Sequence, residues 1–477
     1  MEDARSEKMH TKMGALTLGE SGVAPANTPF LPSELYGEIV AQLPYQSSVL
    51  KKCALVARSW VTPCRARLFA HLTIYPRAYP PDLSHPFESN LARSAAPAVR
   101  QQLIALLQMP TAFAAAPDIP SHVRVLTVNM MRLASPSDRA AGAEAAVKVI
   151  KMFPRLRTLT LDARSLDYPD LSPELQATLC SVLGQPQLTS LHLRGQDVTD
   201  TGVHDLLRSA RHLRRLSIWP RPLLYVRLDG EDVPGLPPDF HRPQLHVLHL
   251  VGPFDAALAW ASAPHCPLDL RALRTLSLSP RHAFDMGGAF ARFAAAHGAG
   301  VRELAVSLCD VWSVVGPEAG AAAGLAFLAH MPALREVRVR DRVLAPWPLL
   351  CVARLLEAAA RETRVEAFEL RVAVWEAEED EHRRREVVRN HWREVSERLA
   401  AVRRGSTLRV IRLVAVPAAE ASQADADRLR LWIEYCLPEF VDACRDILTY
   451  EAMDGSIDWD ENAAWEGGTV WEDADLR

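Results

Sequence analysis

One short pattern of apolar residues returns ten times in this chain and restricts the folds open to it. Each copy has an apolar residue, two variable residues and then two apolar residues flanking a variable one. The copies start at residues 123, 156, 188, 213, 245, 273, 301, 334, 365 and 408. Alternation of apolar and variable residues is the two-residue period of a strand. Most gaps between copies hold a run of helical spacing, so the pattern predicts a strand followed by a helix, many times over.

A strand and helix of this kind can bury their apolar faces only against neighbouring copies, which predicts a solenoid. The copies start 25 to 43 residues apart, and several spacings exceed the roughly 20 to 29 residues of regular leucine-rich repeats. We therefore expect an α/β fold in which residues 123–450 form an irregular leucine-rich-repeat solenoid, a horseshoe whose strands line the concave face.

A small helical module is predicted ahead of the repeats, over residues 30–75. Its first stretch opens with a Leu-Pro pair, which suits the first turn of a helix, and continues with apolar residues every four positions, at Leu35, Ile39 and Leu43. Two more helical stretches follow at residues 47–60 and 64–74. A three-helix module of this size cannot bury all its apolar side chains, so some remain for a partner.

Three other segments complete the expected organisation. Residues 1–29 are polar and carry no periodic pattern, which predicts a disordered N-terminal arm. Residues 76–122 are rich in proline and alanine, which predicts a linker with one helix. Residues 451–477 form an acidic tail with three tryptophans, which is expected to be partly disordered.

Charge and hydropathy point away from nucleic acid and membrane as partners. The formal net charge is -4, and along the sequence the basic residues are scattered rather than gathered in one stripe. No stretch approaches the roughly 18 apolar residues of a membrane-spanning helix, and the first residues lack the apolar core of a signal peptide. The eight cysteines are far apart, as in a reduced compartment. We expect a cytoplasmic or nuclear protein.

Residues 31–74 resemble an F-box. The pattern of that family is a Leu-Pro pair, apolar residues on the first helix, a cysteine-valine stretch and a tryptophan, matched here by Leu31, Pro32, Leu35, Ile39, Leu43, Leu50, Cys53, Val56 and Trp60. The chain as a whole is similar to the large F-box family of mushroom-forming fungi, in which the box precedes irregular leucine-rich repeats. Residues 198–218 also resemble a repeat subtype common in F-box proteins.

This resemblance implies the substrate-recognition subunit of a Skp-cullin-F-box ubiquitin ligase, a receptor with no catalytic residue and no cofactor of its own. The box would bind a Skp-type adaptor, and through it a cullin, by Leu31, Pro32, Leu35, Ile39, Leu43, Leu50, Val56 and Trp60. The repeats would hold a protein target of unknown identity. The alternative is a leucine-rich-repeat scaffold that binds proteins without engaging a ligase.

The variable residues of the strands predict the target surface, because they point away from the buried apolar residues toward the concave side. The candidate target-binding residues are Asp162, His192, Arg194, Trp219, His249, Arg338, Arg340, Arg371 and Arg412. Trp219 is either an aromatic interface anchor or covered by the proline-rich segment that follows it. The late arginines either favour an acidic or phosphorylated target or reflect the abundance of arginine throughout the chain.

No motif points to catalysis or to a metal ion. His241, His246 and His249 lie close in sequence, but no cysteine or carboxylate stands at ligand spacing, so solvated histidines are expected. The chain has no G-x-S-x-G, no phosphate-binding G-x-x-x-x-G-K and no H-E-x-x-H. An enzyme of unrecognised chemistry would need a closed pocket of convergent titratable groups rather than an open face.

Overall fold

The fold was analysed in a computed structural model. It describes residues 33–42, 47–56, 58–77, 104–130, 136–162, 171–195, 201–219, 240–252, 255–279, 288–307, 323–341, 346–374, 393–404, 407–417 and 423–452. The contacts divide the chain into two compact units, Met1–Leu68 and Phe69–Arg477, each taken here by itself. The predicted N-terminal arm, much of the predicted linker and all but the first two residues of the predicted acidic tail lie outside the described residues.

The first unit contains three helices, α1 (Ser33–Gln42), α2 (Ser47–Val56) and α3 (Arg58–Leu68). Their shared core is small: Val40, Leu50 and Cys64 are buried, one from each helix. Trp60 packs against this core, and its ring meets the ring of Tyr36 edge to face at 5.5 Å between centroids. The Arg67 guanidinium donates to the backbone carbonyl of Val40, which ties α3 to α1.

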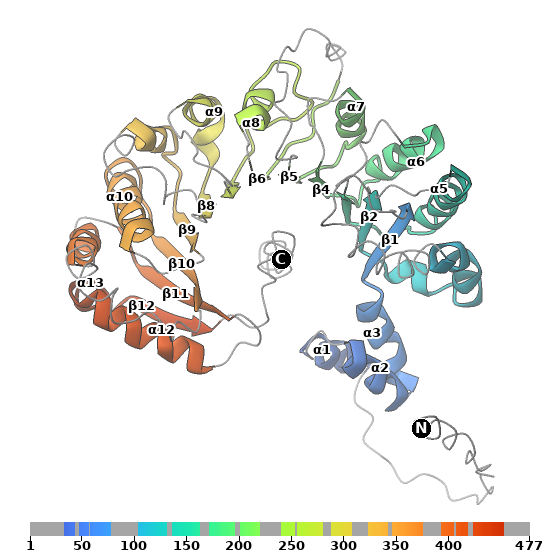
Figure 1. The fold of residues 1–477 in the computed structure, drawn as a ribbon, viewed down its shortest axis with the longest axis horizontal. Coiled ribbons are helices and arrows are strands. Elements are labelled where there is room, and N and C mark those ends of the chain that lie inside the picture. The colour runs from blue at the N-terminus through green and yellow to red at the C-terminus, as the bar shows by residue number, and fades with distance from the viewer. Residues whose placement is uncertain are drawn as a thin grey trace, which may run out of the picture. The chain divides into compact units, whose positions relative to one another are not determined.

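The second unit is built on one twelve-stranded parallel sheet in which every strand pairs with the next strand along the chain. Figure 1 shows these strands side by side in chain order. Their bounds are β1 (His71–Arg77), β2 (Val125–Met130), β3 (Thr158–Asp162), β4 (Ser190–Arg194), β5 (Arg215–Trp219), β6 (Val247–Val251), β7 (Thr275–Ser279), β8 (Glu303–Ser307), β9 (Glu336–Asp341), β10 (Ala367–Val374), β11 (Val410–Pro417) and β12 (Leu448–Ala452). Parallel strands in sequential order, most of them reached through a described helix, make a solenoid-like α/β fold.

The ten copies of the sequence pattern coincide with β2 to β11, so the predicted strands are confirmed. The third predicted helical stretch is wrong in its bounds, because α3 ends at Leu68 and residues 71–77 form β1. Leu72 and Ile74 continue the apolar ladder of the sheet, pairing in register with Leu126 and Val128. Ile74 is buried by this pairing, so the strand belongs to the second unit and not to the helical module.

Helices cover one face of this sheet (Figure 1). They are η1 (Ile119–His122), α5 (Pro136–Ile150), α6 (Pro173–Leu183), α7 (Thr201–Ser209), α8 (Asp255–Ala261), α9 (Ala289–His297), η4 (Gly298–Gly300), η5 (Ala323–His330), α10 (Pro346–Glu362), α12 (Gln423–Cys436) and α13 (Pro438–Cys444), with further helical residues at 104–115 and 393–404. A representative start is that of α6, where the Ser172 hydroxyl caps the helix by accepting from the backbone N–H of Leu175. We call the other side of the sheet its open face.

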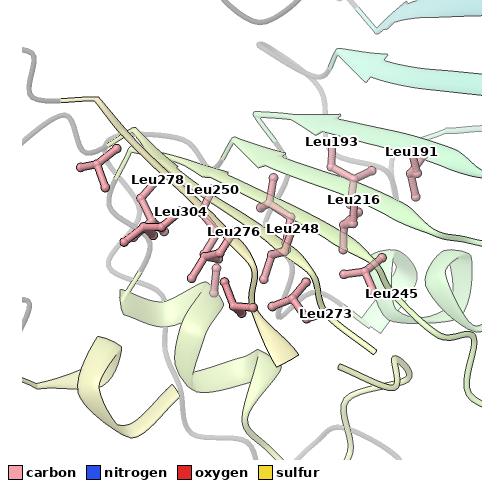
Figure 2. Packing of buried hydrophobic residues seen from close by; sticks show 14 of the residues in the cluster. Leu191, Leu193, Leu216, Leu245, Leu248, Leu250, Leu273, Leu276, Leu278 and Leu304 are labelled. Carbon is pink, nitrogen blue, oxygen red and sulfur yellow. The ribbon is translucent and has the colours of Figure 1, made fainter. Parts of the chain in front are cut away.

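The core lies between the sheet and its helices and consists of apolar residues stacked in register from strand to strand. Figure 2 shows leucines of β4 to β8 pointing to the same side of the sheet, among them Leu191, Leu216, Leu248, Leu276 and Leu304. These five side chains are fully or almost fully buried. Burying a leucine contributes about 1.5 to 3 kcal/mol, so this ladder contributes substantially to stability. Among the described residues, no helix is both long and apolar enough to cross a bilayer.

Candidate binding surfaces

The helical module leaves four large apolar side chains exposed, two on α1 and two at the end of α2. Leu35 is 42% exposed and Ile39, one turn later, is 37% exposed. Leu55 and Val56 are 86% and 73% exposed. The exposed Lys51 and Lys52 stand one turn before them on α2. Leucine, isoleucine and valine are among the residues most often buried in a folded chain, so four exposed ones in so small a unit make a candidate surface for a partner.

The residues predicted for adaptor binding fall into three groups. Leu35, Ile39 and Val56 are exposed. Leu50 is fully buried in the core of the module, and Trp60 is partly exposed and packs against that core. The remaining three, Leu31, Pro32 and Leu43, lie outside the described residues. Sequence reasoning missed Leu55, although it sits in the same apolar stretch of α2 as Val56.

The open face carries the variable residues of every strand in continuous rows. One row runs from strand to strand through Thr160, His192, Ser217, His249, Ser277, Ala305, Arg338, Glu369 and Arg412. A second, two residues further along, joins Asp162, Arg194 and Trp219. Residues distant in the sequence therefore become direct neighbours, and the predicted target-binding residues of β3 to β6 are brought together.

The first half of this face, on β3 to β7, is polar but mostly uncharged. The Ser217 hydroxyl and His249 Nδ1 are hydrogen-bonded at 3.0 Å. The Arg194 guanidinium lies over the Trp219 ring, 5.7 Å from its centroid, a cation–π contact that fixes both side chains. The backbone there is held by Gly195, whose positive φ of 68° lets its N–H donate to the Trp219 carbonyl.

The histidines of this half are neutral at neutral pH. Burial lowers the pKa of His192 to about 4, helped by the nearby charges of Arg194 and Arg215. Burial likewise lowers the pKa of His249 to about 3, helped by His192 and Arg194. The expectation of solvated histidines therefore fits His241, which is exposed, whereas His246 and His249 are only partly exposed and burial lowers the pKa of both.

The Ser217 and His249 pair is not an activated nucleophile. A general base must have a pKa near the working pH to remove a proton from a hydroxyl, whereas the pKa of His249 is about 3. Its imidazole is thus too weakly basic for that task. What the pair offers is hydrogen bonding, so this part of the open face can recognise polar groups of a ligand.

The second half, on β8 to β11, alternates arginine with glutamate. Arg338 Nε lies 2.6 Å from Glu336, and Arg371 Nε lies 2.5 Å from Glu369. Arg412 is 3.6 Å from the other carboxylate oxygen of Glu369. The predicted basic stripe is therefore a set of ion pairs. The sequence carries the signal, since Glu336 and Glu369 each stand two residues before an arginine of the same strand and so on the same face.

Two of the predicted target-binding residues are not accessible, because Asp162 and Arg340 are buried. Seven remain at least partly exposed on the open face: His192, Arg194, Trp219, His249, Arg338, Arg371 and Arg412. Over the described ranges, no three histidine, cysteine or carboxylate side chains are placed to share a metal ion. Burial raises the pKa of the Cys266, Cys436 and Cys444 thiols to about 12, so they stay protonated.

Comparison with known proteins does not identify the function of these surfaces. A scan against models of protein families gives no match to this chain, and a search of curated proteins gives no significant match. The function must therefore be argued from the residues of the chain and their placement.

Proposed function

We propose that this chain is the non-catalytic substrate-recognition subunit of a Skp-cullin-F-box ubiquitin ligase, with an F-box as its first unit and a leucine-rich-repeat solenoid as its second. The observation that carries the proposal is the exposure of Leu35, Ile39, Leu55 and Val56 on the helical module. Three of these four hold positions that the F-box resemblance assigns to the adaptor contact.

The energetics of the module support a partner at these residues. Among the described residues, its core holds one buried side chain from each of three helices, far less than an independent domain of ordinary stability buries. Covering a leucine or isoleucine that is now in water contributes up to about 1.5 to 3 kcal/mol, in proportion to the area covered. A partner that covers the exposed apolar residues would therefore gain affinity and stabilise the module at once.

The open face of the solenoid supports the second half of the proposal. It offers neutral hydrogen-bonding groups on β4 to β6, an aromatic ring at Trp219 and ordered arginine and glutamate side chains on β9 to β11. Such a mixture of polar groups, arginines and an aromatic anchor is typical of protein interfaces. A folded protein or a peptide target fits this surface better than a small molecule does, because these polar and charged residues are spread over strands from β4 to β11.

The adaptor interaction can be tested with the exposed residues of α1. Leu35→Ala and Ile39→Ala are each expected to weaken binding of a purified Skp-type adaptor by about thirtyfold, or about 2 kcal/mol, which is typical of an interface anchor. Neither change should lower the melting temperature, because both side chains are largely in solvent. Affinity is measured by titration calorimetry and stability by a thermal melt.

Leu431→Ala is the matched control for these variants, because Leu431 is 62% exposed and lies on α12 in the other unit. It should bind the adaptor like the parent. Adaptor affinity that is unchanged in both α1 variants would contradict the F-box assignment and favour a protein-binding scaffold without a ligase.

Target binding is expected to use the exposed part of the open face. Trp219→Ala and Arg412→Glu should each reduce capture of a target that co-purifies with the parent chain, with adaptor binding unchanged. Arg340 is unsuitable for such a test because it is buried, and reversing a buried charge would unfold the protein rather than probe the surface. Quantitative mass spectrometry of the co-purified proteins measures how much target each variant recovers. A target recovered in full with both variants would show that it binds outside the open face.

A further inference from the structure

An uninterrupted row of mainly basic residues runs along the edge of the sheet where the strands begin. The row is formed by the second residue of each copy of the repeated pattern, which is arginine in seven of the ten copies. The row consists of Arg124, Arg157, Thr189, Arg214, His246, Arg274, Arg302, Arg335, Glu366 and Arg409. From Arg157 onward, the backbone N–H of each member donates to the carbonyl of the member before it, at 2.7 to 3.0 Å. We call these residues the arginine row.

Their charges lie close enough to act on one another. The pKa of Arg124 is lowered first by burial and then by the positive charges of Arg155 and Arg157. The pKa of His246 is lowered first by burial and then by Arg274 and Arg214, its neighbours in the row on either side. Like charges that depress one another's pKa repel, so the edge is primed for an anionic ligand.

Most of these arginines have no carboxylate partner among the residues that the structure describes. Arg157, Arg214, Arg274 and Arg302 are exposed, and among the described residues none of them forms an ion pair. The row changes character only near its end, where Arg335 lies 3.7 Å from Glu366. From β2 to β8 it therefore carries five arginines and no acidic residue.

The expectation that the basic residues are scattered is thus wrong for the folded chain. They are scattered along the sequence, at intervals of about 30 residues, but the parallel pairing of successive strands brings them side by side. A stripe of this kind is invisible to a window moved along the sequence and follows directly from the register of the repeats.

We infer that the arginine row binds an extended acidic segment of another polypeptide. Neighbouring strands are about 4.8 Å apart, so Arg124 and Arg302 stand about 29 Å apart, with three arginines between them at spacings of about 5 or about 10 Å. In an extended peptide, the side chains on one face repeat every ~6.6 to 6.8 Å. Five carboxylates at alternate positions of such a segment span about 27 Å, which is close to the length covered by the five arginines, and the guanidinium fork suits a carboxylate.

Two other polyanions fit the row less well. Single-stranded nucleic acid is held by aromatic side chains that stack on its bases, and no member of the row is phenylalanine, tyrosine or tryptophan. An anionic membrane is held by basic residues together with apolar ones that enter the bilayer, and the row contains no apolar residue. The row consists of other residues than the proposed target-binding and adaptor-binding ones, so this inference does not rest on the proposed ligase function.

The test uses the full chain and a fluorescent peptide of about 10 residues in which glutamate alternates with serine, about 33 Å long when extended. The parent should bind this peptide, more weakly as salt is raised, and should not bind the same peptide with glutamine in place of glutamate. A variant with Arg157→Glu, Arg214→Glu, Arg274→Glu and Arg302→Glu should bind at least about tenfold more weakly, because even weak exposed ion pairs add over four sites.

The matched control reverses four exposed arginines on the helices, Arg292, Arg361, Arg404 and Arg430, to glutamate. It changes the net charge by the same amount and should retain the parent's affinity for the peptide. Thermal melts report folding, and Arg274→Gln with Arg302→Gln is a milder pair if the fourfold variant unfolds. The inference is overturned if the parent does not bind the acidic peptide, or if both fourfold variants lose affinity for it equally. It is also overturned if a single-stranded oligonucleotide or phosphatidylserine vesicles bind the row more tightly than the peptide.

Discussion

Acidification from about pH 7 to about pH 5 is expected to lower the free energy of unfolding of this protein by several kcal/mol. Burial lowers the pKa of His192 and His204 to about 4 and that of His249 to about 3, from the ordinary value of 6.5. Below pH 6.5 the unfolded chain takes up protons on these side chains while the folded chain does not. The free energy of unfolding therefore keeps the full contribution of these histidines above about pH 6.5 and loses it as the pH falls toward 4. At pH 5 the loss is on the order of 2 kcal/mol per histidine.

His204 adds a buried site on the helical side to the two on the open face. Its ring lies among the helices, 6.4 Å from the Trp260 ring and 5.8 Å from the His265 ring. Arg208 and His265 lower its pKa further and Asp205 raises it, but burial has the largest effect. A proton on this imidazole would place a charge in the packed layer between α7 and α8, which the fold resists.

The measurement is a urea titration at about pH 7 and at about pH 5 on the parent and on a variant with His192→Asn, His204→Asn and His249→Asn. The variant is expected to be less stable at pH 7, because it loses packing, but to lose much less stability on acidification. His212→Asn is the control, since His212 is an exposed residue in the turn before β5. If the triple variant loses as much stability as the parent on acidification, other groups control the acid transition.

The fold could be predicted as far as the repeated pattern extends. Each of β2 to β11 presents buried apolar residues at alternate positions, and nothing but a half-buried strand has that period. The same reasoning missed β1, because Leu68 and Leu72 stand four apart as on a helix while Leu72 and Ile74 stand two apart as on a strand. Only the pairing of Ile74 with Val128 decides between them.

The last strand was missed for a different reason. β12 has a neighbour on one side only among the described strands, so its apolar residues are under weaker constraint, and Leu448 and Tyr450 are only partly buried. A terminal repeat of a solenoid is expected to depart from the pattern of the inner ones. The end of the array therefore cannot be placed by counting copies.

The binding surfaces were predicted less well than the fold, because the exposure of a side chain depends on neighbouring side chains whose positions cannot be read from the sequence. Alternation correctly assigns His192 and Arg412 to the open face, yet it cannot tell that Arg340 is buried or that Glu369 lies against two arginines. The arginine row needs more still, namely the exact register between strands about 30 residues apart. The local sequence pattern determines which side of a strand a residue faces. The register between paired strands determines which side chains it contacts there.

The second large effect is expected from Leu276→Ala, in the middle of the leucine ladder (Figure 2). Leu276 is fully buried on β7, and truncation of such a leucine typically costs about 3 kcal/mol, within a range of 2 to 5. In a solenoid each strand is supported only by its neighbours, so damage at β7 weakens the coupling between β1 to β6 and β8 to β12. The unfolding midpoint should fall, and the slope of stability against denaturant should fall too, because the two halves begin to unfold separately.

Leu413→Ala provides the matched comparison, since Leu413 is the same residue type, is equally buried and lies on β11, one strand from the end of the described sheet. It should cost a similar amount locally but loosen only β11 and β12, so that the main transition keeps nearly the parent's midpoint. Urea titrations followed by circular dichroism and by tryptophan fluorescence separate the two cases, because uncoupled halves give transitions that do not coincide. If the two variants instead lower the midpoint equally with an unchanged slope, the sheet unfolds as one unit and coupling reaches beyond nearest neighbours.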